Sequence, residues 1–208
     1  MMTHSTTPPL LLVYRPQVWR RRTRRVIDTI TAALLLLAAT PVLTIACIAI
    51  LLDDGWPVIF PQRRVGRFER LFTMYKLRTM RRDHCGDLLK PRSANDQRIT
   101  RVGRILRKSS IDELPQMINV LRGEMALIGP RPEMPFLVRK YEHWQHLRHL
   151  VTPGLTCIWQ TEKRSTIALE HPDATALDVA YISKASPVFD CLLLIKTVPA
   201  ILASHNTH

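Results

Sequence analysis

The fold and chemistry of the chain depend on residues 107–116, which read Arg-Lys-Ser-Ser-Ile-Asp-Glu-Leu-Pro-Gln. The apolar run Met117 to Leu121 follows directly and predicts a helix. Pro115 is tolerated only in the first turn of a helix, because its ring lacks an N–H and would clash further inside. The helix is therefore expected to begin close to the adjacent carboxylates of Asp112 and Glu113.

These two carboxylates have two competing interpretations. Ser110 and Glu113 have the spacing of a capping box, and most acidic residues in this position only cap a helix. Alternatively, a helix N-terminus suits phosphate, and Arg107 with Lys108 would keep Asp112 ionised and able to act as a nucleophile. Successive helical residues point about 100° apart, so one carboxylate could attack while the other holds a metal. Spacing alone favours the cap.

Further motifs, together with Asp112 to Gln116, resemble the bacterial sugar transferase family, the monotopic phosphoglycosyl transferases. In chain order they are Tyr75-Lys76-Leu77-Arg78-Thr79-Met80, Arg98-Ile99-Thr100-Arg101-Val102-Gly103, Ile118-Asn119-Val120-Leu121-Arg122-Gly123-Glu124-Met125, Gly129-Pro130-Arg131-Pro132-Glu133 and Thr152-Pro153-Gly154-Leu155-Thr156. The resemblance covers nearly the whole chain, from about Arg20 to about Leu202. It implies an enzyme that moves a sugar 1-phosphate from a UDP-sugar to polyprenyl (undecaprenyl) phosphate and releases UMP. That reaction would be the first membrane step in assembling an exopolysaccharide, capsule, O-antigen or glycoprotein glycan.

The resemblance also implies roles for five residues. Asp112 is expected to be the nucleophile that forms a covalent phosphosugar intermediate, and Glu113 the ligand of Mg²⁺. Lys76, Arg107 and Arg131 are expected to bind substrate phosphates. The prolines on either side of Arg131 restrict the backbone, and a guanidinium can bind a diphosphate with two parallel hydrogen bonds. Without the other motifs, Arg131 would be interpreted as a solvated arginine in a surface turn.

Residues 26–52 are almost wholly apolar, and about 27 residues are enough to span a bilayer. They predict a transmembrane helix kinked at Pro41, a secretory signal cleaved before Cys47, or a re-entrant hairpin that breaks at Thr40 and Pro41. Basic residues mark the cytoplasmic side of a membrane, and arginines flank both ends of this stretch. They are Arg20–Arg22, Arg24 and Arg25 before it, and Arg63, Arg64, Arg67 and Arg70 after it. The hairpin is therefore favoured, and the resemblance implies the same break, usually at Ser-Pro.

The expected fold is α+β and mostly helical. It belongs to a monotopic membrane protein with an N-terminal re-entrant helix hairpin and interfacial amphipathic helices. Residues 1–19 are expected to be a disordered cytoplasmic tail, residues 20–54 the basic flank and re-entrant membrane helix, and residues 55–204 the cytoplasmic catalytic domain. The expected location is the cytoplasmic face of the bacterial inner membrane.

Several shorter elements are also predicted from the pattern of apolar residues. Short strands are expected at residues 57–60, 72–77, 126–128 and 155–161. Helices are expected at residues 101–108, as a basic amphipathic helix, and at residues 188–195, lying along the membrane. Apolar residues at helical spacing from Leu137 to Val151 predict one more helix, packed either in the core or at the membrane interface.

The formal net charge of +13 and pI near 10.4 require anionic partners. The expected partners are a UDP-sugar, polyprenyl phosphate and anionic lipids, with a homodimer left open and no nucleic acid. The alternative is a membrane-tethered basic protein that binds nucleic acid without catalysis. It explains the charge but not the Asp-Glu pair, and aromatic residues for base stacking make up only 6% of the chain.

Two features leave questions open. The four cysteines form no CxxC pair, which indicates reduced thiols rather than a disulfide framework or zinc site. The loop from Cys157 to Arg164 departs most from the family, so its role in binding stays open. No motif in the chain distinguishes glucose, galactose or an N-acetylated amino sugar.

Overall fold

The structure is a computed structural model that describes residues 21–84, 96–158, 161 and 172–203, so the predicted tail at residues 1–19 lies outside the described part. The α-helices are α1 (Arg21–Asp54), α2 (Arg101–Lys108), α3 (Met117–Arg122), α4 (Pro135–Val138), α6 (Pro172–Lys184) and α7 (Pro187–Ala203). The 3-10 segments are η2 (Arg67–Glu69), η3 (Arg82–His84), η4 (Ile111–Gln116) and η5 (His143–Leu150). The strands are β1 (Ile59–Val65), β2 (Leu71–Leu77), β3 (Ala126–Ile128) and β4 (Gly154–Thr156). The predicted mostly helical character is confirmed.

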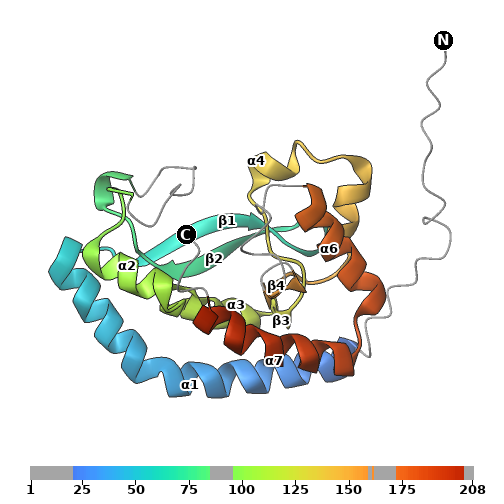
Figure 1. Cartoon of the computed structure of the whole chain (residues 1–208), viewed down its shortest axis with the longest axis horizontal. Coiled ribbons are helices and arrows are strands. Elements are labelled where there is room, and N and C mark those ends of the chain that lie inside the picture. The colour runs from blue at the N-terminus through green and yellow to red at the C-terminus, as the bar shows by residue number, and fades with distance from the viewer. Residues whose placement is uncertain (1–20, 85–95, 159–160, 162–171, 204–208) are drawn as a thin grey trace, which may run out of the picture.

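Two small sheets lie above the long helix α1 (Figure 1). Strands β1 and β2 form an antiparallel hairpin in which Phe60 pairs with Lys76, and β3 and β4 pair in parallel. Helix α3 packs between β2 and α1, and η4 packs against β2. The main core joins these elements through Phe72, Met74, Met117, Val120 and Met125. The Asp-Glu segment is therefore supported directly by the hairpin.

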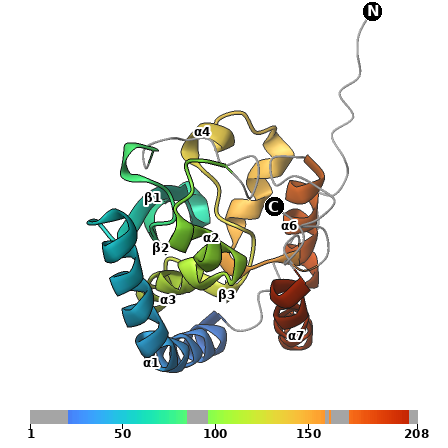
Figure 2. The same cartoon turned by 60° about the vertical axis from the view of Figure 1, so that its left-hand side comes forward.

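Helix α1 is one continuous helix of 34 residues that includes Pro41. Figures 1 and 2 show a bend near its middle, not two legs separated by a break. Proline removes one backbone hydrogen bond from a helix and bends it. The Thr40 hydroxyl donates to the Leu36 carbonyl at 2.9 Å, and the Thr44 hydroxyl donates to the Thr40 carbonyl at 2.9 Å. The predicted interruption at Thr40 and Pro41 is thus a bend within a helix, whereas re-entry into a membrane stays a prediction.

Helix α1 is long and apolar enough to cross a bilayer, as judged by length and composition. Its apolar side chains remain largely outside the protein core. The exposed ones are Val26, Ile27, Ile30, Leu34, Leu35, Leu37, Val42, Ile45, Ile48, Leu51 and Leu52. A patch of this size on a soluble surface is unusual and marks a site of contact with membrane or protein.

The start of α1 is held to the rest of the domain by two arginines. Arg24 is buried; it donates to the Ile128 carbonyl and, at 2.9 Å, to the Tyr181 hydroxyl. Arg25 donates to two carbonyls of α3. These arginines were expected to form a basic flank at the membrane. The structure adds that both donate to carbonyls within the fold, which sequence alone does not reveal, and the basic flank stays a prediction.

The end of α1 is held by its two terminal carboxylates. Asp54 forms an ion pair at 2.9 Å with Arg78, which is 2% exposed and also donates to the Asp54 and Gly55 carbonyls. Asp53 accepts a hydrogen bond at 2.9 Å from the backbone N–H of Val102, in the first turn of α2. Both ends of the apolar helix are therefore attached to the same domain.

Helix α2 has the predicted bounds and is anchored at its start. The Thr100 hydroxyl accepts from the Gly103 N–H at 2.8 Å, as a helix cap does. Gly103 lies so close to the end of β2 that a Cβ atom there would approach the Thr79 carbonyl oxygen to 2.1 Å. Only glycine allows this approach, which fixes the helix that carries Arg107.

Several predicted elements differ from the structure. The helix expected from Leu137 to Val151 is wrong, because this region forms the short α4 and the 3-10 segment η5. A capping box between Glu142 and Gln145 starts the second piece, and Arg148 is buried where a surface polar residue was expected. The hairpin and β4 also have other bounds than predicted, since β1 extends to Val65 and β4 ends at Thr156.

Replacing Gly103 should destabilise the protein. In Gly103→Ala the added methyl group would force α2 away from the Thr79 carbonyl, and overpacking of this kind costs about 1–3 kcal/mol. We expect a lower midpoint of thermal unfolding in detergent, whereas Arg104→Ala, at the exposed neighbouring position, should unfold near the wild-type temperature. Equal midpoints for Gly103→Ala and wild type would contradict the close contact.

Candidate active site

The Asp-Glu pair lies on the 3-10 segment η4, not at the start of an α-helix. Ser110 adopts a left-handed backbone conformation (φ 57°) between α2 and η4, and its side chain makes no capping hydrogen bond. The α-helix predicted near the acids begins at Met117, after Pro115. The interpretation of Ser110 or Asp112 as a helix cap is therefore wrong. The chain turns into η4 at Ser110 without a capping hydrogen bond from a side chain, and α3 begins only after both residues.

Glu113 is held by two cations from different parts of the chain. Its Oε1 accepts a hydrogen bond from Lys76 Nζ at 2.7 Å and one from Arg131 Nη2 at 2.8 Å. Burial alone would raise the pKa of this carboxyl, but Arg131 and Lys76 outweigh it and hold the pKa well below its usual range. Glu113 is therefore a fixed, permanently ionised carboxylate.

Asp112 is in the opposite situation. It is 8% exposed, and no donor among the described residues forms a hydrogen bond with its carboxylate. Burial raises its pKa to about 6, although Lys76 and, less strongly, Arg107 act against that shift. A carboxyl with this pKa is about 90% ionised at pH 7. Burial, and not the field of Arg107 and Lys108 expected from the sequence, thus dominates the pKa of Asp112.

The three predicted phosphate ligands come from three elements: Lys76 and Arg131 bind Glu113, whereas Arg107 acts on Asp112 through its charge. Lys76 comes from β2, Arg107 from the last turn of α2 and Arg131 from the loop after β3. Burial lowers the pKa of Lys76 and of Arg107, while Glu113 outweighs burial and raises the pKa of Arg131. The structure thus brings together all five predicted residues; their catalytic and binding roles stay predictions.

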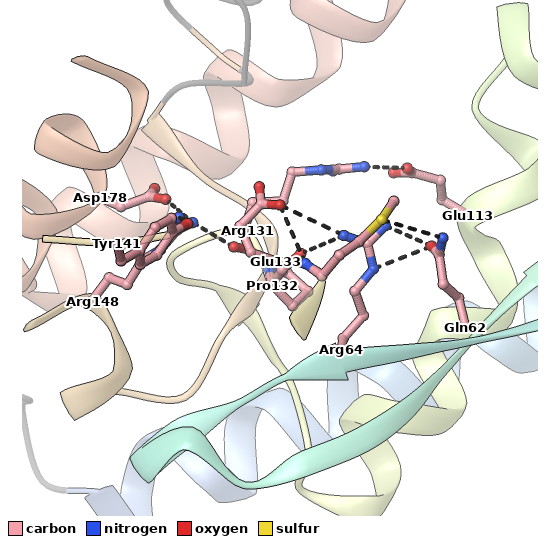
Figure 3. A network of polar contacts seen from close by, with 10 residues as sticks. Gln62, Arg64, Glu113, Arg131, Pro132, Glu133, Tyr141, Arg148 and Asp178 are labelled. Carbon is pink, nitrogen blue, oxygen red and sulfur yellow. Dashed lines mark hydrogen bonds and ion pairs between the residues drawn. The ribbon is translucent and has the colours of Figure 1, made fainter. Parts of the chain in front are cut away.

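The loop that carries Arg131 is supported by buried residues that sequence reasoning missed. They are Arg64, Glu133, Arg148 and Asp178, which Figure 3 shows around the loop. Glu133 is the last residue of the motif that contains Arg131, and Asp178 lies in a segment that continues the family resemblance imperfectly. The motif positions of Glu133 and Asp178 do not reveal that these residues are buried, because charged residues are most often exposed to solvent.

The two carboxylates also fit a magnesium site. Mg²⁺ is usually held by one or two carboxylates together with substrate phosphates and water, not by a cage of protein ligands. The part of the chain that the structure describes contains no cluster of three or more His, Cys, Asp or Glu side chains. Lys76 and Arg131 both bind Oε1 of Glu113, which leaves its second oxygen as an acceptor for a cation. The carboxylates of Asp112 and Glu113 therefore suit a Mg²⁺ ion that a substrate diphosphate would also coordinate.

The divergent loop from Cys157 to Arg164 is described only at Cys157, Ile158 and Thr161. Cys157 and Ile158 are buried. The remaining residues of that loop lie outside the described part of the chain.

Comparison with known proteins matches residues 19–204 to the bacterial sugar transferase family. A Bacillus subtilis protein, named as the uncharacterized sugar transferase EpsL, is 41% identical over 88% of this chain and 89% of its own length. A UDP-glucose:undecaprenyl-phosphate glucose-1-phosphate transferase of Caulobacter vibrioides is 38% identical over 89% of this chain and 72% of its own length. An undecaprenyl-phosphate glucose phosphotransferase of Komagataeibacter xylinus is 37% identical over 90% of this chain but only 37% of its own length. The resemblance seen in the motifs is confirmed, and the chain is an enzyme that belongs to the bacterial sugar transferase family.

Proposed function

We propose that the enzyme transfers a sugar 1-phosphate from a UDP-sugar to undecaprenyl phosphate and releases UMP. The observation that carries this proposal is a buried Asp112, whose carboxylate accepts no hydrogen bond from the described residues, next to a Glu113 fixed between Lys76 and Arg131. The names of the relatives support the same reaction class, because they include transferases that act on UDP-glucose and on UDP-N-acetylgalactosamine with undecaprenyl phosphate.

The reaction proceeds in two displacements at one phosphorus atom. A carboxylate oxygen of Asp112 forms a bond to the β-phosphorus, and the bond from that phosphorus to the bridging oxygen breaks, so UMP leaves with the oxygen. An oxygen of undecaprenyl phosphate then forms a bond to the same phosphorus and displaces Asp112. Such covalent catalysis divides one difficult step into two easier ones. A carboxylate that accepts no hydrogen bond, as is true of Asp112 among the described residues, is a stronger nucleophile than one already bound to donors.

The cations around Asp112 position the diphosphate and offset its charge. Phosphoryl transfer depends almost entirely on positioning and electrostatic stabilisation. Lys76 and Arg131 are already held by Glu113, so they need little reorganisation when the substrate binds. Arg107 is half-buried beside Asp112 and approaches from α2. Glu113 would hold Mg²⁺, which neutralises charge on a diphosphate when bound.

The enzyme acts on the cytoplasmic face of the bacterial inner membrane, with α1 entering and leaving the bilayer on that face. Supporting this is the attachment of both ends of α1 to one domain, through Arg24 and Arg25 at the start and Asp53 and Asp54 at the end. A helix that crossed the bilayer would place those ends on opposite sides of roughly 30 Å of hydrocarbon, where one domain could not bind both. Exposed apolar side chains along α1 would contact lipid tails, and anionic lipids would attract the basic surface.

Asp112 should be indispensable for turnover. An amide cannot attack phosphorus, so Asp112→Asn should lower UMP release by about 10³-fold or more, as removal of a covalent nucleophile does in other enzymes. The exposed Asp83→Asn is the matched control and should retain activity. Mass spectrometry of wild-type enzyme with UDP-sugar and Mg²⁺, but no acceptor, should find a sugar-phosphate adduct on the peptide containing Asp112. An adduct on another residue, or full activity of Asp112→Asn, would refute the nucleophile.

Arg131 should require its guanidinium and not only its charge. Arg131→Lys keeps the charge but loses the planar fork, so we expect a loss of about 1–3 kcal/mol in transition-state binding, measured as kcat/KM. Arg139→Lys changes an exposed arginine nearby and should leave kcat/KM unchanged. Wild-type kinetics in Arg131→Lys would show that Arg131 does not touch the substrate phosphates.

The two ends of α1 should lie on the same side of the membrane. Single cysteines replacing Thr7, outside the described residues, and the exposed Arg139 would be introduced into a variant without native cysteines. Both should resist an impermeant thiol reagent in intact cells and react after lysis. Labelling of one position alone in intact cells would show that α1 spans the bilayer.

A further inference from the structure

The loop that carries Arg131 is bound through its backbone carbonyls by several distant elements. Four consecutive carbonyls, from Pro130 to Glu133, each accept a donor. The backbone N–H groups of Gly154 and Val65 serve the two outer carbonyls, each at 2.9 Å. The two inner carbonyls, of Arg131 and Pro132, accept from arginine side chains instead.

Arg148 binds the first of these inner carbonyls. Its Nη2 donates to the Arg131 carbonyl at 2.6 Å and also pairs with Asp178 of α6, and its Nη1 donates to the Tyr141 hydroxyl at 2.5 Å. The side chains of Arg148 and Asp178 are each 1% exposed. Figure 3 shows this group on one side of the loop.

Arg64 binds the second inner carbonyl from the opposite side. Its Nη1 donates to the Pro132 carbonyl at 3.1 Å and lies 3.9 Å from the Glu133 carboxylate. Its Nη2 donates to Gln62 at 2.6 Å, which orients the guanidinium along β1. Arg64 is 4% exposed. Figure 3 shows Arg64 and Gln62 between the hairpin and the loop.

Two buried guanidiniums on adjacent carbonyls require an explanation beyond ordinary packing. Removing a charged group from water is unfavourable unless it is paired, and packed apolar residues often stabilise a fold equally well. Both arginines are paired, but each also donates a hydrogen bond to the loop backbone, Arg148 to the Arg131 carbonyl and Arg64 to the Pro132 carbonyl. The side chain held between these two contacts is that of Arg131, which reaches Glu113. A guanidinium fork can hold a carboxylate and a carbonyl at a fixed relative angle, which an apolar side chain cannot do.

We propose that Arg148, anchored by Asp178, and Arg64, anchored by Gln62 and Glu133, are positioning residues that clamp the backbone of Arg131 from two sides. The clamp sets the direction in which the Arg131 guanidinium leaves the loop toward Glu113 and the substrate phosphates. This inference rests on the proposed phosphate-binding role of Arg131. A displacement of about 1 Å at a positioned group can lower a rate by about 100-fold.

The test is a double-mutant cycle on UMP release. Arg148→Lys keeps the positive charge but cannot serve Tyr141, Asp178 and the Arg131 carbonyl together, so kcat should fall by about 10- to 100-fold with little change in KM for undecaprenyl phosphate. Arg64→Lys should behave in the same way. In Arg131→Ala there is no guanidinium left to position, so adding Arg148→Lys should lower kcat no further.

Matched controls separate positioning from general destabilisation. Arg63→Lys changes the exposed neighbour of Arg64 on the same strand and should retain wild-type kcat. Leu193→Ala removes a buried core side chain and should lower the unfolding temperature without lowering kcat at temperatures where the variant is folded. Hydrogen–deuterium exchange, which is independent of activity, should show faster exchange of the Arg131 and Glu133 amides in Arg148→Lys and Arg64→Lys but not in Arg63→Lys.

The outcomes distinguish this inference from the proposed function. If the wild-type enzyme releases no UMP from any UDP-sugar, the proposed function fails before the cycle is measured. If wild type is active, Arg131→Ala is impaired and the effects of Arg148→Lys and Arg131→Ala multiply, the clamp is refuted while the function stands. Unchanged amide exchange in the two lysine variants would also refute the clamp. Equal kcat for Arg131→Ala and the double variant that adds Arg148→Lys would support it.

Discussion

The active site depends on one carboxylate held between two cations. Glu113 Oε1 receives both Lys76 and Arg131, and these residues lie 37 and 18 positions away in the chain. A buried carboxylate without such partners would be strongly destabilising, so the β-hairpin, η4 and the loop after β3 must be in place together. Catalytic geometry and folding of the central domain are therefore coupled through the same ion pairs.

The pairing also explains how two adjacent carboxylates can have different properties. Glu113 is compensated by Lys76 and Arg131, whereas Asp112 is buried without a bonded donor among the described residues. Their pKa values are consequently moved in opposite directions, and such divergence is typical of paired catalytic carboxyls. On a regular α-helix both acids would compete for the positive end of the helix dipole. The 3-10 segment, short and followed by Pro115, gives each side chain its own environment.

Sequence reasoning found the residues that meet at the site but not the structure that holds them. The ordered motifs identified four of them, Lys76, Asp112, Glu113 and Arg131. The strand and helix around these residues follow from the spacing of apolar residues. The predicted cap at Ser110 was wrong because Ser110 adopts a left-handed backbone conformation, and a serine in the sequence does not indicate that conformation. The long helix through Arg148 was wrong because periodicity assumes that charged residues face solvent, and this arginine faces the interior. Burial of Arg24, Arg64 and Asp178 depends on partners that are distant in sequence, which a local pattern does not contain.

The attachment at the end of α1 has a consequence for how the enzyme meets its lipid substrate. Arg78, which binds Asp54 and Gly55, stands two positions beyond Lys76 on the same extended segment. At about 3.3 Å per residue, the backbone of Arg78, whose side chain binds the end of the apolar helix, lies about 7 Å from the backbone of Lys76. Under the proposed function, the depth of the reacting phosphate relative to the apolar layer would thus be set by hydrogen bonds, not by a linker. A lipid phosphate could then be engaged at constant height while its hydrocarbon tail stays dissolved in the bilayer, whatever the length of that tail.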